Sequence, residues 1–276
     1  MTVIAMTREI GSLGTEVAAG VAKRLGLEIV RSEVAANNVA RRLGVAESAV
    51  ARYLDGSASL LERWQIERRK LFRYASEEIL SLAQRGNVLI KGWGAATLLR
   101  DVSQVISARV CAPMDFRVRV MMERQGRKDA AMVREEIERF DAARARTLRA
   151  YFNVDQEDAR LYHIVLNTER LSVDACVDAV CKLAEGVRFR DTFTSRSALA
   201  NKLLEAKISS ALVEHISVAM APLGLSVSVA NGKVTLAGRS CSGRLRKQAE
   251  KIAHATVGML QIDNRIVSVP TRGSAF

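Results

Sequence analysis

Two glycines and two hydroxyl side chains follow the first apolar residues of the chain, in a pattern suited to holding phosphate. Residues 3–6 are typical of a short strand, apolar residues recur at helical spacing from position 17 onward, and between these segments stand Gly11, Ser12, Gly14 and Thr15. A strand that turns through glycines into a helix directs backbone N–H groups and the positive end of the helix dipole toward a ligand. The sequence therefore indicates a phosphate site at this turn.

The same turn lacks the lysine of a standard phosphate-binding loop. A P-loop has the sequence G-x-x-x-x-G-K-[ST], with its lysine on the β- and γ-phosphates and its hydroxyl on Mg²⁺. Here Thr15 and Glu16 follow Gly14, and Arg8 is the only cation nearby. From spacing alone, a phosphate site and an ordinary strand–turn–helix stay equally open.

An excess of basic residues predicts an anionic partner. The 276 residues include 42 Lys and Arg against 30 Asp and Glu, a net charge of +12, which would attract nucleotide, nucleic acid or lipid headgroups. Aromatic residues make up only 5% of the chain, and no basic run is interleaved with them. Because a surface for single-stranded nucleic acid needs aromatic rings on which bases stack, we do not expect nucleic acid as a partner.

The cysteines and histidines show no spacing typical of a metal site, so we expect none built from them. The first residues carry no signal-peptide pattern, and no apolar stretch reaches the ~20 residues of a membrane span. We expect reduced, packed cysteines in a cytoplasmic protein. These residues are Cys111, Cys176, Cys181, Cys241, His163, His215 and His254.

Strand and helix patterns alternate as far as residue 185, which predicts an α/β domain with a doubly wound, parallel sheet of five strands. Residues 186–197 lose this periodicity, are polar and basic, and are typical of a linker. Over 198–270 the order is helix, strand, strand, helix, strand, with Asn231-Gly232 as a hairpin turn. We therefore expect domains at 1–185 and 198–270, the second a small αββαβ unit.

Five dispersed segments, in matching order, resemble the cytidylate kinase-like family of P-loop nucleoside monophosphate kinases over residues 2–185. The resemblance implies a P-loop-type fold, ATP as phosphoryl donor, Mg²⁺, and a CMP-like acceptor. The segments are Arg8-Glu9-x-Gly11-Ser12-x-Gly14, Ile90-x-Gly92-x-Gly94-Ala95, Ala112-Pro113-x-x-x-Arg117, Asp141-x-x-Arg144 with Tyr151-Phe152, and residues 161–168.

The resemblance also implies roles for single residues. Arg117 also lies at the start of a predicted helix, at the carboxyl end of the preceding strand, where ligands lie in open α/β sheets. The alternative for it is a salt-bridged surface arginine. Arg31 is either a phosphate contact or a solvated arginine. For ATP, the implied residues are Arg8, Gly11, Ser12, Gly14 and Thr15, and Ser12 or Thr15 would bind Mg²⁺ through water. For the acceptor, they are Arg31, Gly92 and Gly94. For catalysis, they are Arg117, Asp141 and Arg144, with Arg146 as an alternative to Arg144.

Three cations expected of such kinases are missing from this sequence. The loop has no lysine, and Thr15 and Trp93 stand where the family has arginines. Each charged contact to the reacting phosphoryl group contributes about 3 kcal/mol to catalysis. Two functions therefore stay open: a kinase that phosphorylates a (d)CMP-like nucleotide, or a weak or inactive nucleotide-sensing protein.

The C-terminal unit resembles a BON domain over nearly all of residues 198–269. That family is a small module without catalytic residues, associated with phospholipid or protein contacts, so the resemblance implies a membrane surface or a protein as partner. Such a unit suits the sensing alternative. The matching segments are Val227-x-Val229-x-Asn231-Gly232, Ala249-x-x-Ile252-Ala253 and Val257-Gly258-x-Leu260-x-Ile262-x-Asn264-x-Ile266.

Overall fold

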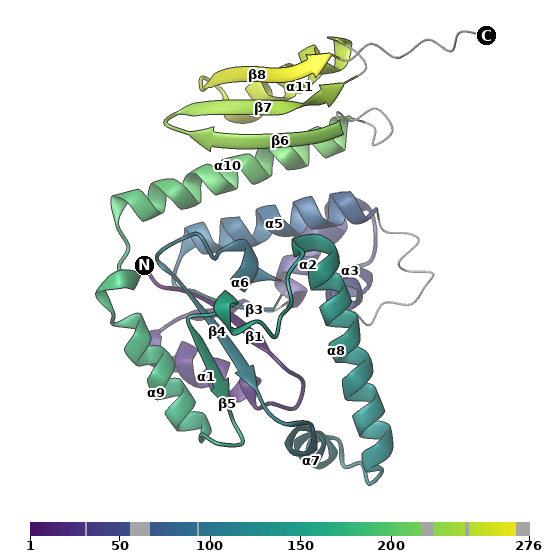
Figure 1. Cartoon of the computed structure of the whole chain (residues 1–276), viewed down its shortest axis with the longest axis vertical. Coiled ribbons are helices and arrows are strands. Elements are labelled where there is room, and N and C mark those ends of the chain that lie inside the picture. The colour runs from purple at the N-terminus through teal and green to yellow at the C-terminus, as the bar shows by residue number, and fades with distance from the viewer. Residues whose placement is uncertain (31, 56–66, 93, 217–222, 241–242, 269–276) are drawn as a thin grey trace, which may run out of the picture. The chain divides into compact units, whose positions relative to one another are not determined.

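The structure is a computed structural model that describes residues 1–30, 32–55, 67–92, 94–216, 223–240 and 243–268 (Figure 1). The described residues form two compact units, 1–55 with 85–196 and 67–84 with 197–268. The sequence prediction places 67–84 in the first domain, whereas in the structure this segment groups with the second unit. It belongs to helix α5, Arg68–Arg85.

The first unit is built on a five-stranded sheet in which every strand is parallel to its neighbours, as predicted. The strand order is β2-β3-β1-β4-β5. Because all five strands run the same way, their carboxyl ends meet at one edge, where ligands bind in open α/β sheets. The strands are β1 Val3–Arg8, β2 Glu28–Val30, β3 Val88–Lys91, β4 Val105–Cys111 and β5 Ile164–Asn167.

Helices connect these strands and cover both faces of the sheet (Figure 1). In chain order they are α1 Gly14–Leu25, α2 Ser32–Leu43, α3 Glu47–Asp55, α6 Ala95–Leu98, α7 Met114–Gln125, α8 Ala130–Phe152 and α9 Val173–Ala184, with short 3₁₀ turns at Ala159–Leu161 and Val187–Phe189. Helix α1 ends at Gly26, whose φ of 64° is the left-handed value expected of a glycine that closes a helix.

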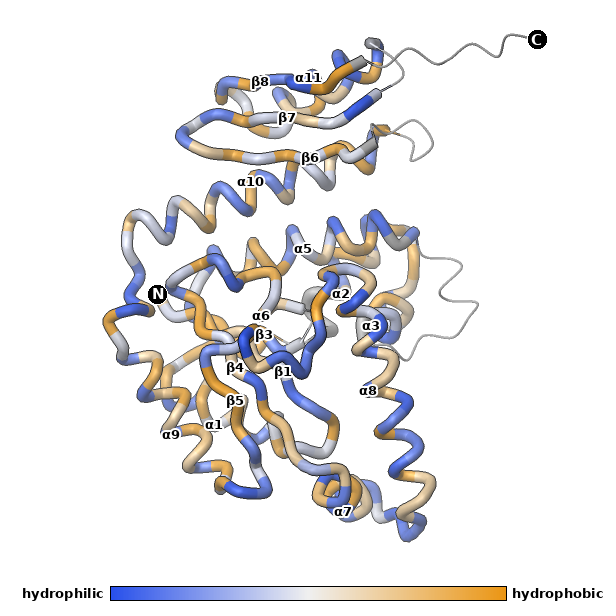
Figure 2. Tube along the Cα trace, viewed as in Figure 1, coloured by the Kyte–Doolittle hydropathy of each residue, from blue (hydrophilic) through white to orange (hydrophobic). Residues whose placement is uncertain are grey.

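Alternate residues of β1 and β4 form the core against α1 and α9. Figure 2 shows hydrophobic segments, in orange, that recur along these two helices. Ile4 and Met6 of β1 and Ala108 and Val110 of β4 are buried there, against apolar residues of the two helices. Successive side chains of a strand point to opposite faces of the sheet. The intervening residues, which include the paired Thr7 and Arg109, therefore point to the other face.

Residues 193–268 have the predicted αββαβ order. The sheet order is β6-β7-β8, antiparallel between β6 and β7 and parallel between β7 and β8, and apolar residues of α10 and α11 pack on this sheet. The hairpin turn falls at Asn231 and Gly232, both with positive φ. The elements are α10 Phe193–His215, β6 Leu223–Ala230, β7 Lys233–Ser240, α11 Gly243–Val257 and β8 Gln261–Ser268.

Helix α10 begins inside the segment predicted as a linker. The Thr192 hydroxyl accepts a hydrogen bond from the Ser195 amide, and the Ser195 hydroxyl accepts one from the Thr192 amide. This reciprocal pair satisfies two backbone donors at the start of the helix, as in a capping box. The polar residues that suggested a linker are therefore a helix start.

Asn264 ties the open edge of β8 to helix α11. Its side-chain amide donates to the Arg246 carbonyl at 2.9 Å and to Glu250 Oε2 at 3.0 Å, and its Oδ1 accepts from the Ile266 amide at 3.2 Å. Arg246 in turn donates to the Asn264 carbonyl at 3.1 Å. These side chains cover main-chain groups that would otherwise be free to pair with another strand.

None of the helices in the described ranges combines the length and the apolar composition that crossing a lipid bilayer requires.

We predict that Asn264→Ala destabilises the second unit by about 1–3 kcal/mol, since its partners lose their hydrogen bonds. Gln261→Ala, at the exposed start of the same strand, is the matched control. Hydrogen exchange of the β7 and β8 amides should quicken in the Asn264 variant alone. Equal exchange in both variants would contradict the role given to Asn264.

Candidate functional site

The loop after β1 is held in shape by a buried serine. The Ser12 hydroxyl donates to the Glu9 carbonyl at 2.8 Å and lies 3.3 Å from the Val110 carbonyl of β4, and the side chain is fully buried. Thr168, after β5, donates to the Ser12 carbonyl at 2.7 Å. Because the hydroxyl proton is used inside the loop, Ser12 shapes the turn, whereas Thr15 is exposed.

Two glycines of the loop stand where a side chain would not fit. At Gly11, φ is +75° and an added Cβ would lie 2.6 Å from the Arg117 carbonyl oxygen of α7. At Gly14, an added Cβ would lie 2.6 Å from Arg8 Cβ. Leu13 between them also has positive φ, at 54°. The loop thus lies directly against β1 and the start of α7.

Helix α1 starts without a capping side chain among the described residues. Its N-cap is Leu13, whereas α8 and α9 are capped by the side chains of Asp129 and Ser172. The first amides of a helix have no partner within the helix and carry partial positive charge. This start of α1 therefore suits the phosphates of a nucleotide, which the residues present can hold through backbone N–H groups.

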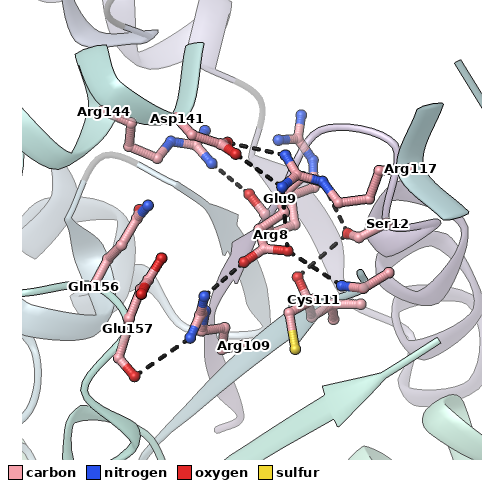
Figure 3. Close-up of polar contacts among 12 residues, drawn as sticks. Arg8, Glu9, Ser12, Arg109, Cys111, Arg117, Asp141, Arg144, Gln156 and Glu157 are labelled. Atoms are coloured by element: carbon pink, nitrogen blue, oxygen red, sulfur yellow. Dashed lines mark hydrogen bonds and ion pairs between the residues drawn. The ribbon is translucent and has the colours of Figure 1, made fainter. Parts of the chain in front are cut away.

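Glu9 connects this loop to β4 and to α7 (Figure 3). Its Oε1 accepts from Arg109 Nη2 at 2.6 Å, and its Oε2 accepts from the Ala112 amide at 3.2 Å and lies 3.7 Å from Arg117 Nη1. One carboxylate therefore lies against two buried guanidinium groups and fixes a turn amide.

Arg117 joins α7 to α8 and to the loop. Its Nη1 and Nη2 contact the two carboxylate oxygens of Asp141 at 2.8 and 3.0 Å, and its Nε donates to the Ile10 carbonyl at 2.8 Å. The Arg117 side chain is only 5% exposed. Most of its donors are thus used within the protein.

Arg144 reaches from α8 to the end of β1. One terminal nitrogen donates to the Arg8 carbonyl (Figure 3), and the other lies 4.0 Å from the position of a Cβ on Gly92, after β3. Nearby, the Phe152 ring packs on Gly94, where an added Cβ would lie 2.3 Å from that ring. A cation from α8 is thereby placed at the carboxyl edge of the sheet.

The structure gathers most residues that the sequence singles out at this edge. Arg31 lies outside the described residues, as does Trp93. His163 lies at the other end of β5, where its Nδ1 accepts from the Ser107 amide at 3.0 Å and its ring packs on Phe189. Burial, aided by the charge of Arg188, lowers the pKa of His163. The residues gathered are Arg8, Gly11, Ser12, Gly14, Thr15, Gly92, Gly94, Arg117, Asp141 and Arg144.

Sequence reasoning missed four polar residues that line this edge, namely Glu9, Arg109, Gln156 and Tyr162. Arg109 was the detectable one, because a charge inside the apolar segment 105–111 is unusual for a buried strand. Burial raises the pKa of Tyr162, while a hydrogen bond with Thr7 and the charges of Arg109 and Arg144 act in the opposite direction. Within the described part of the chain, no group of His, Cys, Asp and Glu side chains could hold a metal ion.

Comparison with known proteins gives two family matches and several relatives. The model of the cytidylate kinase-like family matches residues 3–170, and that of the BON domain matches residues 201–270. A cytidylate kinase of Aeropyrum pernix is 29% identical over 180 residues, 65% of this chain and 95% of the relative. One from Pyrobaculum aerophilum is 28% identical over 177 residues, 64% of this chain and 89% of the relative.

A solved structure shares the fold of the first unit. It is an uncharacterized protein from Eubacterium ventriosum, with a TM-score of 0.53 and 21% identity, covering 67% of this chain and 99% of the other.

We predict that Gly11→Ala destabilises the protein more than Gly26→Ala does. Both positions have positive φ, which costs an alanine about 1 kcal/mol, but nothing lies within 4 Å of a Cβ at Gly26. Gly11→Ala adds the contact with the α7 backbone and should also distort the loop. Urea unfolding of the two variants measures the difference, and equal losses would contradict the close approach of loop and helix.

Asp141→Asn should lower the free energy of unfolding by about 2–3 kcal/mol, because it leaves the buried Arg117 without its main counter-charge. Asp115→Asn is the control, since Asp115 also pairs across α7 and α8, with Arg134, but is 77% exposed. That change should cost below about 1 kcal/mol. Thermal unfolding of both variants checks this, and a comparable loss in the two would refute the structural role of the Arg117–Asp141 pair.

Proposed function

The chain belongs to the cytidylate kinase-like family, and from that membership we propose that it transfers the γ-phosphoryl group of ATP to a nucleoside monophosphate of the CMP or dCMP type. The observation that carries the proposal is the position of Arg144. Its guanidinium lies at the Arg8 carbonyl and beside Gly92, between the loop that suits the donor phosphates and the strand end that suits the acceptor.

Residues of this chain would act mainly by position and charge. The backbone from Gly11 to Thr15 and the start of α1 bind the donor phosphates. Arg144 stabilises the negative charge of the phosphoryl group during transfer. Arg117 and Asp141 hold α7 against α8, which sets the position of Arg144 three residues further along the helix. When bound near Thr15, Mg²⁺ supplies further neutralisation of the phosphate oxygens.

The hydrogen bonds and ion pairs that Arg117 already makes within the protein favour a second function. Its donors are taken by Asp141 and Ile10, and Glu9 lies close by, so it has little to offer a phosphate. With no lysine in the loop, a protein that binds nucleotide but transfers slowly fits these contacts. In that alternative, nucleotide occupancy is sensed and the BON-like unit, which we propose as residues 198–270, contacts a phospholipid surface or a protein partner.

We place either function in the cytoplasm. Cys111, Cys176 and Cys181 are free thiols, as expected for a reducing compartment. Burial is the main cause that raises the pKa of all three thiols, so they favour the protonated form.

The test is a phosphoryl-transfer assay with Mg·ATP and CMP, compared between the wild type and an Arg144→Ala variant. The variant should lose about 10²–10³-fold in kcat with a smaller change in KM, as for removal of a group that stabilises the transition state. Arg139→Ala, an exposed arginine on the same helix, is the control and should keep the wild-type rate.

Two results would overturn the kinase proposal. One is an Arg144→Ala variant as fast as the wild type. The other is binding of nucleotide by the wild type without any transfer, which would favour the sensing alternative.

A further inference from the structure

Arg109 is a buried arginine whose hydrogen-bonding capacity is not used up. It is 8% exposed in the middle of the sheet. Its Nη2 donates to Glu9 Oε1 at 2.6 Å, and its Nη1 makes only a long contact of 3.5 Å with the Glu157 carbonyl. Its Nε has no hydrogen-bond partner among the described residues. Buried polar atoms are nearly always paired, so an unpaired one suggests a missing ligand.

The register of the sheet places Arg109 on the face opposite to helix α1. Arg109 is paired with Thr7 in the β1–β4 ladder, and the residues that alternate with them, Met6 and Ala108, pack toward α1. Arg109 therefore faces the opposite side from the start of α1. A phosphate bound there would belong to the acceptor and not to the donor.

Arg144 and Tyr162 lie on the same side as Arg109. Arg144 donates to the carbonyl of Arg8, next to Thr7, and neighbouring strands are only about 4.8 Å apart. The Tyr162 hydroxyl donates to the Gln156 carbonyl at 2.9 Å. Burial raises the pKa of Tyr162, and the positive charges of Arg109 and Arg144 oppose that shift. Figure 3 shows both guanidinium groups on the side where Gln156 and Glu157 lie.

Among the described residues, few negative groups lie close to this position. Glu9 is shared with Arg117 and the Ala112 amide, while Asp141 is paired with Arg117. Asp155 acts on Tyr162 but lies 3.8 Å from Arg149, and Glu157 is exposed and contacts Arg109 through its carbonyl oxygen. The acidic groups near Arg109 and Arg144 are thus shared with other cations, and the pair retains net positive charge.

We propose that Arg109, with Arg144, binds the phosphate of the acceptor nucleotide. The proposal rests on the proposed kinase function for the identity of that acceptor. A phosphate oxygen is a strong acceptor that suits the two unused nitrogens of Arg109. Glu9 orients the guanidinium and competes with the phosphate for it.

The two partners of this ion pair should affect CMP binding differently if Arg109 holds a phosphate. Arg109→Gln and Glu9→Gln both remove the contact of 2.6 Å, and Glu9→Gln also removes the carboxylate charge beside Arg117, so it should destabilise the protein at least as much. Arg109→Gln removes the cation, and CMP binding measured by calorimetry should weaken at least about tenfold, as for a lost charged contact. Glu9→Gln keeps the cation and removes the competing carboxylate, so CMP binding should weaken clearly less than in Arg109→Gln.

The proposal is overturned if Arg109→Gln binds CMP like the wild type, or if the Arg109 and Glu9 variants weaken binding equally.

A parallel arm with inorganic phosphate separates this proposal from the kinase function. If the wild type does not bind CMP, the acceptor assignment fails. The subsite then stands only if phosphate raises the melting temperature of the wild type and not of Arg109→Gln. If the wild type responds to neither CMP nor phosphate, the subsite is refuted. If it binds CMP and Arg109→Gln does so equally well, the subsite is refuted while the kinase proposal stands.

Discussion

The Glu9 carboxylate is the contact on which the geometry of the site depends. Arg109 and Arg117 are both almost fully buried, and burying guanidinium groups is costly unless a carboxylate compensates them. The Glu9 carboxylate lies against both guanidinium groups and accepts a hydrogen bond from the Ala112 amide. The Glu9 main-chain carbonyl accepts a hydrogen bond from the Ser12 hydroxyl. One residue thereby sets the distance between the donor loop, the central strand β4 and the start of α7. Asp141, on α8, is the second carboxylate that pairs with the buried Arg117 guanidinium.

This arrangement explains how a loop without a lysine can keep a defined shape. The uncapped start of α1 provides backbone donors, and the cations come from other elements instead of from the loop itself. Arg144 reaches the loop from α8, which packs against α7 through a small apolar cluster that includes Val118 and Ile137. Arg144 therefore depends on the packing of α8 for its position at the end of β1.

Much of the fold could be predicted from the sequence, and the site only in part. The alternation of apolar strands and amphipathic helices is local, so the five parallel strands and the αββαβ unit were predicted from it. The loop glycines and Arg144 were found because they lie in recurring segments. Arg109 and Glu9 pair across 100 positions of sequence, and no local pattern encodes such a contact. The start of α10 was missed because Thr192 and Ser195 look like linker residues until their reciprocal hydrogen bonds are seen.

The most direct measurement of the central claim is calorimetric titration with a bisubstrate analogue, adenosine and cytidine joined through five phosphates. If the donor loop and the acceptor side form one site, the analogue should bind with a stoichiometry of one and far more tightly than ATP or CMP alone, because the second half binds without a further loss of translational freedom. Binding no tighter than that of ATP, or two equivalents per chain, would show that the two sides do not form a single phosphoryl-transfer site.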